Sequence, residues 1–343
     1  MRIALDATYS LDRQLSGLGI YSRQILFGLP YAHPEARYRF CYRPHRFLRS
    51  FSENLPPNCA RCLLGYGLPL SSDLFHGLNQ RIDSARYRRT VATFHDLFVI
   101  TGEYSTAEFR KRFVEQARRA AERSDLIIAV SRFTAEQVRD LLKVDQSKIR
   151  VVHHGFRPLP KTAVTAVREN VILSVGAIQR RKNIARLVEA FERVDAPGWK
   201  LILAGSFGFG AAEIQGRIDE SSKCKSIELP GYISNQRLEE LYARASIFAF
   251  PSLDEGFGMP VLDAMARGVP VLTSNQSALP EISGGAALLV DPADVDSIAC
   301  GLSSLIKRPG LREELIGKGL EHSARFTWES ALKATWRVYE ELL

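Results

Sequence analysis

The sequence lacks the cysteine pattern of a disulfide-stabilised protein. Its 343 residues include only five cysteines, an odd number at scattered positions, and this argues against a disulfide framework. Cys59 and Cys62 have the spacing of a metal-ligand pair, but no second pair with that spacing follows. We therefore expect neither a disulfide core nor a bound metal at these residues.

Long apolar runs are also missing. No run approaches the roughly 20 apolar residues that a membrane-spanning helix needs. The first residues, from Met1 to Asp6, reach an acidic side chain too early for a secretory signal and are typical of a β-strand. With 45% hydrophobic and 24% charged residues the composition is that of an ordinary globular protein, and we expect a cytoplasmic one.

Positive charge is concentrated in the first half of the chain. Residues 1–165 contain 26 Lys and Arg against 15 Asp and Glu, a net charge of +11, whereas the remaining residues contain 20 against 23, a net charge of −3. This imbalance predicts that the first half contacts something anionic, such as a nucleic acid, a membrane surface or a phosphorylated acceptor. The alternative is a solvated basic surface without a partner.

Strand-like and helix-like segments alternate along the chain, which predicts βαβ units and mostly parallel sheets. The alternation stops near residues 157–169, so we expect an α/β protein with two doubly wound, Rossmann-like domains, residues 1–165 and 166–326. Residues 327–343 are typical of a C-terminal helix that can pack on either domain, including back on the first. Ligands bind at the carboxyl ends of the strands in such sheets, and two such domains would face each other across a cleft.

The expected strands and helices follow from the period of the apolar residues. Strands are expected at residues 2–5, 38–42, 74–76, 91–94, 126–130, 151–153, 171–176, 201–204, 226–229, 247–250, 269–273 and 287–290. Helices are expected at residues 19–29, 107–123, 134–142, 184–194, 236–244, 260–267, 295–306 and 311–326.

The segment Glu255–Asp263 is the part of the sequence that is most informative about ligand binding. It joins a predicted buried strand to a predicted helix and has a carboxylate at each end, with Gly256 and Gly258 in the turn. Pro260 suits the first turn of a helix, and the glycines let the backbone approach a ligand closely. N–H groups at a helix start attract phosphate or sugar oxygens, and carboxylates accept hydrogen bonds from hydroxyls. The segment predicts a site for a sugar that carries a phosphate; a plain strand-to-helix turn is the alternative.

A basic turn follows the first predicted strand of the second half. Arg180, Arg181 and Lys182 precede Asn183, which we interpret as the N-cap of a helix. Cations are unfavourable at the positive end of a helix, so the cluster predicts an anion between them, such as a diphosphate. A solvated basic turn is the alternative.

Two features of the first half are predicted to lie at the carboxyl ends of strands. Gly17 and Gly19 open a helix after the first strand and suit a phosphate cradle, although the full dinucleotide-binding glycine pattern is absent. His95 follows the predicted strand at residues 91–94, where an imidazole can hydrogen-bond a substrate. A turn with two glycines and a buried core histidine are the respective alternatives.

Taken together, these motifs resemble the retaining glycosyltransferases of family 4 (glycosyl transferases group 1), which have the GT-B fold. The resemblance covers the chain from end to end, and it is strongest to bacterial transferases that build surface polysaccharides, often from GDP-mannose. The matching residues are Asp6-Ala7, Gly17-x-Gly19-x-Tyr21, Phe94-His95-Asp96-Leu97, Val130-Ser131-x-Phe133-Thr134, Gly176-x4-Arg181-Lys182-Asn183, Ala204-Gly205, Pro251-Ser252-x2-Glu255-Gly256-Phe257-Gly258, Ala278-Leu279-Pro280-Glu281 and Leu289-Val290-Asp291-Pro292.

The resemblance implies a role for each matching site residue. His95 and Glu255 would contact the donor sugar, and Arg181 and Lys182 would bind the donor diphosphate, so that these four residues carry the catalysis. Where the family has a second glutamate, this chain has Asp263, one methylene shorter, and the resemblance assigns it to the nucleotide ribose. The implied donor-binding residues are Gly17, Gly19, Gly176, Arg181, Lys182, Glu255, Gly256, Phe257, Gly258 and Asp263.

The implied reaction transfers a hexose with retention, usually described as a same-face displacement in which the departing diphosphate takes the acceptor proton. No metal and no cofactor are expected, because the two cations neutralise the diphosphate and no Asp-x-Asp pair is placed as a metal clamp. A sugar-nucleotide epimerase of similar fold and a non-catalytic nucleotide-sugar binding protein remain as alternatives.

The implied acceptor is a saccharide or a lipid-linked saccharide, which favours an anionic membrane surface as the partner of the basic first half. Nucleic acid is not expected, because the second half carries a sugar-nucleotide site. Phe109, Phe113 and Ala117 share one face of the predicted basic helix at residues 107–123, and residues 37–51 add five arginines among Phe and Tyr. The protein would then lie at the inner face of the cell membrane. Alternatively, the phenylalanines belong to the core and the arginines are merely solvated.

Overall fold

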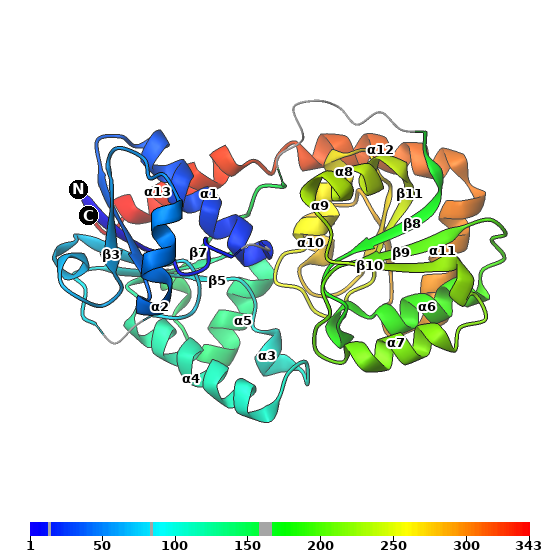
Figure 1. Ribbon diagram of the computed structural model, residues 1–343, viewed down its shortest axis with the longest axis horizontal. Coiled ribbons are helices and arrows are strands. Elements are labelled where there is room, and N and C mark those ends of the chain that lie inside the picture. Colours follow the sequence, from blue (N-terminus) through cyan, green and yellow to red (C-terminus); the bar gives the residue numbers. More distant parts are fainter. Residues whose placement is uncertain (13–14, 83–84, 158–166) are drawn as a thin grey trace. The chain divides into compact units, whose positions relative to one another are not determined.

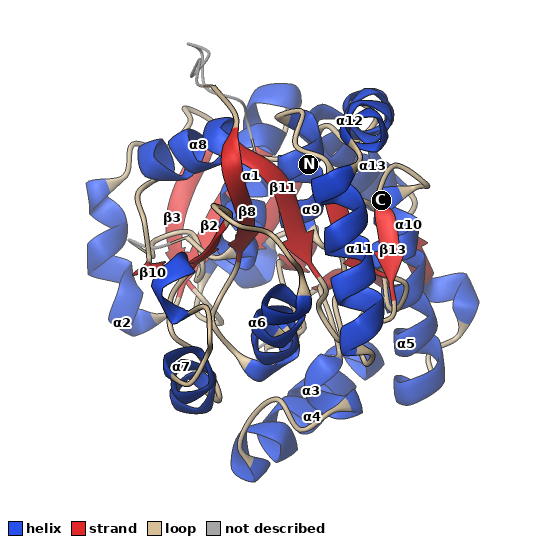
Figure 2. Cartoon of the chain, turned by 90° about the vertical axis from the view of Figure 1, so that its right-hand side faces the viewer, coloured by secondary structure: helices blue, strands red, loops and turns tan. Residues whose placement is uncertain are grey.

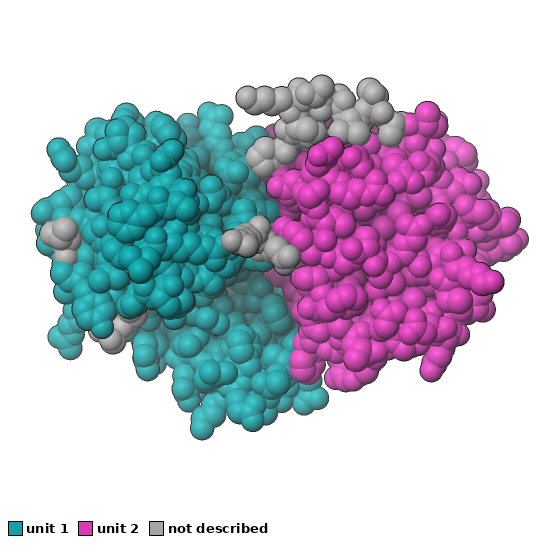
Figure 3. Space-filling view, viewed as in Figure 1, with its two compact units in different colours: residues 1–155, 327–343 teal, residues 156–326 magenta. Residues whose placement is uncertain are grey.

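The computed structural model describes residues 1–12, 15–82, 85–157 and 167–343, which divide into two compact units (Figure 3). Unit 1 comprises residues 1–155 and 327–343, and unit 2 comprises residues 156–326. The chain therefore passes from one unit to the other twice, after Gly155 and after Phe326. The domain boundary expected at residue 165 lies outside the described residues.

Unit 1 is built on a seven-stranded parallel sheet with the order β3-β2-β1-β4-β5-β6-β7 (Figure 1). The edge strand β3 is not among the expected strands, because Cys59-Ala-Arg-Cys-Leu lacks the continuous apolar run of the buried central strands. The last strand ends at Val151, so the strand expected at residues 151–153 is placed two residues too late. The strands are β1 (Arg2–Asp6), β2 (Arg37–Tyr42), β3 (Cys59–Leu63), β4 (Leu74–Gly77), β5 (Thr90–Phe94), β6 (Leu126–Ala129) and β7 (Ile149–Val151).

Helices complete unit 1, and the last of them comes from the far end of the chain. Helix α13 packs on α1, where a Cβ atom on Gly28 would lie 2.5 Å from Leu332 Cδ1. The four buried residues of α4 pack in one core with residues of β4, β5 and β6; they are Phe113, Ala117, Ala120 and Ala121. The helices are α1 (Gly17–Ala32), α2 (Pro44–Phe47), α3 (Phe98–Thr101), α4 (Ala107–Arg123), α5 (Arg132–Leu142) and α13 (Trp328–Glu340), and the 3₁₀ turns are η1 (Leu48–Ser52), η2 (Leu68–Ser71) and η3 (Gln146–Lys148).

Unit 2 repeats the architecture with a six-stranded parallel sheet in the order β10-β9-β8-β11-β12-β13. Its order reverses between β8 and β11, which is the topological position where ligands bind in doubly wound sheets. The strands are β8 (Glu169–Val175), β9 (Lys200–Ala204), β10 (Ile227–Gly231), β11 (Ala245–Phe250), β12 (Val271–Ser274) and β13 (Leu288–Val290).

Helices cover both faces of the second sheet (Figure 2). Helices α6, α7 and α11 share one apolar core with the strands, and α8 and α9 cover the opposite face (Figure 1). The helix at Ala211–Asp219 is missing from the expected elements. The helices are α6 (Ile184–Arg193), α7 (Ala211–Asp219), α8 (Asn235–Arg244), α9 (Met259–Ala266), α10 (Leu279–Ser283), α11 (Val295–Lys307) and α12 (Pro309–Ser323), and the 3₁₀ turns are η4 (Arg180–Lys182) and η5 (Cys224–Ser226).

The predicted pair of doubly wound α/β units is thus confirmed. In the described part of the chain, no helix has both the length and the apolar character that a membrane crossing requires.

Candidate functional site

Two loops of unit 2 bring together three of the predicted catalytic residues. Arg181 and Lys182 lie in η4 after β8, and Glu255 lies between β11 and α9. Arg181 Nη1 is 2.9 Å from Glu255 Oε2, and Lys182 Nζ donates a hydrogen bond to Glu255 Oε1. Their side chains are only 9–11% exposed. The three charges therefore form one buried cluster at the carboxyl edge of the sheet.

Asn183 joins the loops that hold this cluster. It adopts the left-handed conformation with φ 60°, which asparagine tolerates better than most residues. Asn183 is the N-cap residue of α6, as predicted, but its side chain makes no capping hydrogen bond. Instead, Nδ2 donates to the carbonyls of Pro251 at 3.0 Å and Pro292 at 2.7 Å. These bonds tie the carboxyl ends of β11 and β13 to the start of α6.

The glycines around the cluster permit close backbone approach. A Cβ atom on Gly205 would lie 1.8 Å from the carbonyl oxygen of Gly176, so the loops after β8 and β9 pack backbone to backbone. Gly258 has φ +104° and precedes α9, whose first turn contains Pro260 as predicted. Gly256 and Phe257 are buried in the same turn. The predicted strand-to-helix turn is thus present, with Glu255 at its start.

The two cations keep Glu255 ionised. Burial alone would raise the pKa of Glu255, but Arg181 and Lys182 outweigh it and hold the pKa at about 2. Glu255 is therefore ionised at neutral pH, and one carboxylate faces two cations. The Lys182 ammonium also lies 4.5 Å from the centroid of the Phe250 ring.

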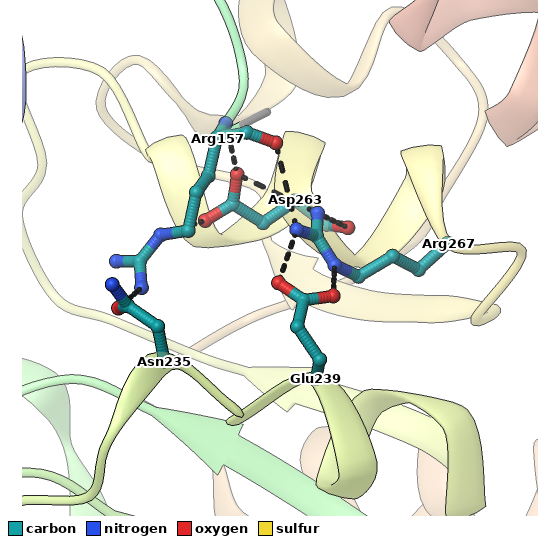
Figure 4. A network of polar contacts seen from close by, with 5 residues as sticks. All are labelled: Arg157, Asn235, Glu239, Asp263 and Arg267. Carbon is teal, nitrogen blue, oxygen red and sulfur yellow. Dashed lines mark hydrogen bonds and ion pairs between the residues drawn. The ribbon is translucent and has the colours of Figure 1, made fainter. Parts of the chain in front are cut away.

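Asp263 lies in α9 in a different environment. It is 2% exposed, and its Oδ1 accepts a hydrogen bond of 2.6 Å from the backbone N–H of Arg157 (Figure 4). Arg267, the C-cap residue of α9, forms two hydrogen bonds of 2.7 and 2.6 Å with the Glu239 carboxylate of α8. Asp263 is thus part of a charged network separate in its contacts from the Glu255 cluster.

Exposed aromatic side chains lie in the loops after β9 and β10, and the sequence did not lead us to predict them. Phe207 is 59% exposed and Phe209 37% exposed in the loop after β9, and Tyr232 after β10 is 45% exposed. The β9 loop is bonded to the η4 loop, because Ile178 N–H donates to the Ser206 carbonyl at 2.8 Å. The sequence signal that could have indicated them is the run Gly-Ser-Phe-Gly-Phe-Gly directly after a predicted strand.

In unit 1, His95 follows β5 and is partly buried. Its Nε2 donates to the Leu78 carbonyl at 2.9 Å, so the neutral ring has Nδ1 as an acceptor. Burial lowers the pKa of His95 to about 4, despite the opposing effect of this hydrogen bond. His95 is therefore neutral at physiological pH and able to accept a hydrogen bond from a hydroxyl.

A buried hydrogen-bond chain supports the surroundings of His95. His76 of β4 bonds Thr93 of β5 at 2.8 Å through Nε2, and Thr93 Oγ1 bonds Tyr21 Oη of α1 at 2.8 Å. The Tyr21 ring then meets His95 edge to face, with ring centroids 4.7 Å apart. Through its ring contact with Tyr21, His95 is joined to a buried chain of hydrogen bonds.

The predicted glycines of unit 1 lie at the start of α1. Ser16 caps this helix by accepting from the Gly19 N–H at 3.4 Å. A Cβ atom on Gly19 would lie 2.8 Å from Leu15 Cδ2, whereas one on Gly17 would meet open space. A side chain at position 19 would therefore displace the Leu15 side chain, and the phosphate-cradle role of both glycines stays a prediction.

No group of three or more His, Cys, Asp or Glu side chains among the described residues is arranged to hold a metal ion.

Two family models match nearly the whole chain. "Glycosyltransferase Family 4" matches residues 17–158, and "Glycosyl transferases group 1" matches residues 159–322. Over 284 residues the chain is 29% identical to the O-antigen chain mannosyltransferase B of Escherichia coli, covering 78% of this chain and 74% of that protein. It is 27% identical over 275 residues to the serotype-specific mannosyltransferase WbdA of Escherichia coli, of which it spans only 34%.

Solved structures share the fold. A sucrose-phosphate synthase from Thermosynechococcus elongatus superposes with a TM-score of 0.79 and 22% identity, covering 100% of this chain and 99% of that one. Anabaena HepE in complex with UDP and glucose superposes with a TM-score of 0.76 and 16% identity, covering 99% of this chain and 100% of that one.

Proposed function

Because the chain belongs to the family 4 glycosyltransferases with the GT-B fold, we propose that it is a retaining hexosyltransferase in surface polysaccharide biosynthesis. The donor we favour is GDP-mannose, since the curated relatives above are mannosyltransferases. The acceptor is a saccharide or a lipid-linked saccharide. The observation that carries the proposal is the buried cluster in which one carboxylate, Glu255, faces the cations Arg181 and Lys182.

The cations bind the donor diphosphate. Two cations that lie beside the start of α6, where backbone N–H groups attract phosphate oxygens, suit an anionic ligand. When the diphosphate arrives, it takes over the cations, and the Glu255 carboxylate becomes available to the hydroxyls of the donor sugar. Since cations already neutralise the diphosphate, we propose that the transfer needs no divalent metal.

The chemical step is a displacement on one face of the sugar. The bond between the anomeric carbon and the diphosphate oxygen breaks, and the bond from the acceptor oxygen to the same carbon forms on the same face. The acceptor proton passes to an oxygen of the departing diphosphate. Arg181 and Lys182 stabilise the charge that develops on the leaving group, which is the main electrostatic demand of such a reaction.

His95 orients the donor sugar. Its Nε2 is committed to the Leu78 carbonyl, so Nδ1 accepts from a sugar hydroxyl without taking its proton. A neutral imidazole suits this role, because a cation near the anomeric carbon would oppose the positive charge that develops there during transfer.

The exposed aromatic residues after β9 and β10 form a platform for the nucleobase. Phe207 and Tyr232 follow neighbouring strands, and the Phe207 loop is bonded to the loop of the diphosphate cations. Stacking of a base on an aromatic side chain contributes about 1–3 kcal/mol. Phe207→Ala should therefore weaken nucleotide diphosphate binding about 5–100-fold in calorimetric titrations. Unchanged affinity would show that Phe207 does not stack on the nucleobase.

The basic first half binds an anionic membrane surface, which brings the protein to a lipid-linked acceptor. On α4 the Phe113 side chain lies in the core, and acidic residues alternate with the exposed cations. The η1 turn is the better contact, because Leu48 is 83% and Phe51 62% exposed beside the exposed Arg49. Apolar side chains flanked by arginine are typical of membrane-interface contacts.

The deciding experiment is incubation with labelled GDP-mannose or UDP-glucose and a saccharide acceptor, with and without excess chelator. Transfer with retained anomeric configuration in chelator supports the proposal. Isomerised donor without transfer would indicate an epimerase, and binding without either reaction would indicate a non-catalytic binding protein. Loss of transfer in chelator, restored by magnesium or manganese, would contradict metal independence.

A further inference from the structure

The segment after β12 lies against the turn that carries Glu255. Ser277 Oγ accepts a hydrogen bond of 3.2 Å from the Glu255 N–H, across 22 residues of sequence. The Ala278 N–H donates to the Glu255 carbonyl, also at 3.2 Å. Both backbone polar groups of Glu255 are therefore bound by two consecutive residues of another loop.

The next residue of this segment supports the same turn. A Cβ atom on Gly258 would lie 2.7 Å from Leu279 Cδ2, so the Leu279 side chain packs directly against the Gly258 backbone. The start of the segment is held as well, because the Asn275 N–H donates to the Val290 carbonyl of β13 at 2.9 Å. The Glu255 turn thus rests on a segment that is itself bonded to the sheet.

Ser277 has a strained backbone. Its φ is 58°, in the left-handed region that a serine occupies only at an energetic cost and a glycine occupies freely. In the part of the chain that the structure describes, the other non-glycine residues with positive φ are Lys143 and Asn183. Strain of this kind persists where surrounding contacts impose it, and it concentrates at functional sites. A serine where a glycine would be unstrained indicates that the hydroxyl itself has a role.

We infer that Ser277 is a positioning residue that holds Glu255 by its peptide group while the Glu255 carboxylate changes partners. The inference rests on the proposed function, in which the donor diphosphate takes over Arg181 and Lys182. In the ligand-free protein these two cations also fix the carboxylate. Once they bind the diphosphate, the bonds from Ser277 and Ala278 to the Glu255 backbone keep the residue directed at the sugar hydroxyls.

Two substitutions separate this positioning role from simple stabilisation. Ser277→Ala and Ser277→Gly both lose the acceptor for the Glu255 N–H, but only the alanine keeps the strain. We therefore expect Ser277→Gly to unfold at least about 2 °C above Ser277→Ala. Both should nevertheless lose turnover alike, by about 5–50-fold, because the reacting groups are misplaced in each. If Ser277 only stabilised the fold, the more stable Ser277→Gly would be the more active variant.

Nucleotide binding gives a second comparison. Because Arg181 and Lys182 are unchanged in both variants, we expect GDP and UDP to bind them with the wild-type dissociation constants in calorimetric titration. Ser246→Ala is the matched control, since it removes a hydroxyl that donates to the Glu169 carbonyl at 2.6 Å at the amino end of β11, and it should keep full turnover. Full turnover in Ser277→Gly, or a fall in nucleotide affinity as large as the fall in turnover, would overturn the inference.

Hydrogen exchange at the Glu255 amide tests the bond without any activity. Measured by NMR on the ligand-free protein, this amide should exchange about 5–10-fold faster in both Ser277 variants than in wild type, the factor for one lost hydrogen bond. Ser246→Ala should leave the rate unchanged. If wild type transfers sugar from neither donor, the proposed function fails, and the exchange rates alone decide whether Ser277 holds Glu255. Equal rates in wild type and both Ser277 variants would overturn that hold.

Discussion

Tyr339 Oη lies 2.6 Å from His76 Nδ1, although 263 residues separate the two in sequence. Both side chains are completely buried, and the bond attaches the last helix of the chain to a central strand of unit 1. From His76 the chain of hydrogen bonds continues through Thr93 to Tyr21, whose ring contacts His95. Helix α13 is thus part of the framework that supports a proposed catalytic residue.

Tyr339→Phe should destabilise the protein by about 1–3 kcal/mol, because it leaves a buried ring nitrogen of His76 without its partner. Urea unfolding measures the difference. Tyr31→Phe, at a tyrosine of α1 that is 71% exposed, should have no effect and serves as the control. Equal losses in the two variants would show that the buried bond contributes nothing.

Acidification below pH 6.5 should destabilise the folded protein. Burial lowers the pKa of His76 to about 3 and that of His95 to about 4, and it also lowers the pKa of His154. Between these values and the ordinary pKa of 6.5, the unfolded chain binds protons that the folded protein does not, so stability falls as the pH falls. Each such histidine contributes up to about 1.4 kcal/mol per pH unit. Urea midpoints at pH 7.5, 6.5 and 5.5 check this; a constant midpoint would contradict it.

Arg181→Ala and Lys182→Ala should each lower turnover by about 10²–10³, the usual scale for removing one preorganised partner of the transition state. Steady-state rates with saturating donor measure the effect. Arg180→Ala is the matched control, because Arg180 precedes them but its guanidinium pairs with the exposed Glu213 instead. Near-normal turnover in both cation variants would show that Arg181 and Lys182 do not stabilise the departing diphosphate.

Glu255→Gln should fold but transfer poorly, because a charged acceptor for sugar hydroxyls becomes a weaker neutral one. The variant also leaves Arg181 and Lys182 buried without their counter-charge, which should lower the unfolding temperature of the ligand-free protein. Adding GDP or UDP should then raise that temperature more than it does in wild type. Full activity in a folded variant would refute the site.

Vesicles of anionic lipid should bind the protein at low salt and release it as the salt concentration rises. Leu48→Ser combined with Phe51→Ser should weaken this binding, whereas the same change at Leu320, a 46% exposed leucine of unit 2, should not. Sedimentation with anionic and neutral vesicles measures the bound fraction. Absence of binding to anionic vesicles at low salt would leave a soluble acceptor as the better interpretation.

The sequence allowed the elements and the residues Arg181, Lys182 and Glu255 to be selected because their signals are local, but it did not predict that the two cations pair with Glu255. Buried parallel strands appear as short apolar runs, and Pro260 after Gly258 identifies the start of α9. Strand β3 was missed because an edge strand needs no continuous apolar run, and its Cys59-x-x-Cys62 spacing suggested other chemistry. The domain boundary was placed at residue 165, in a Pro-containing segment that lies outside the described residues.

The contacts of Asp263 and His76 could not be predicted, since their partners are 106 and 263 residues away in sequence. The motif alone implied a ribose contact for Asp263, and nothing local indicates that one of its oxygens accepts the Arg157 N–H. The side chain of Asn183 shows the same limit. Its position before a helix predicts a cap, but its left-handed backbone turns the amide toward Pro251 and Pro292.

The division of the chain also sets an order for folding during synthesis. Unit 2 is a single continuous stretch, residues 156–326, and it can complete its core as soon as that stretch has left the ribosome. Unit 1 is translated first but lacks α13, and with it the hydroxyl that pairs with His76, until residues 327–343 follow. Unit 1, although its first 155 residues are made first, therefore completes its core only with the last-made segment of residues 327–343.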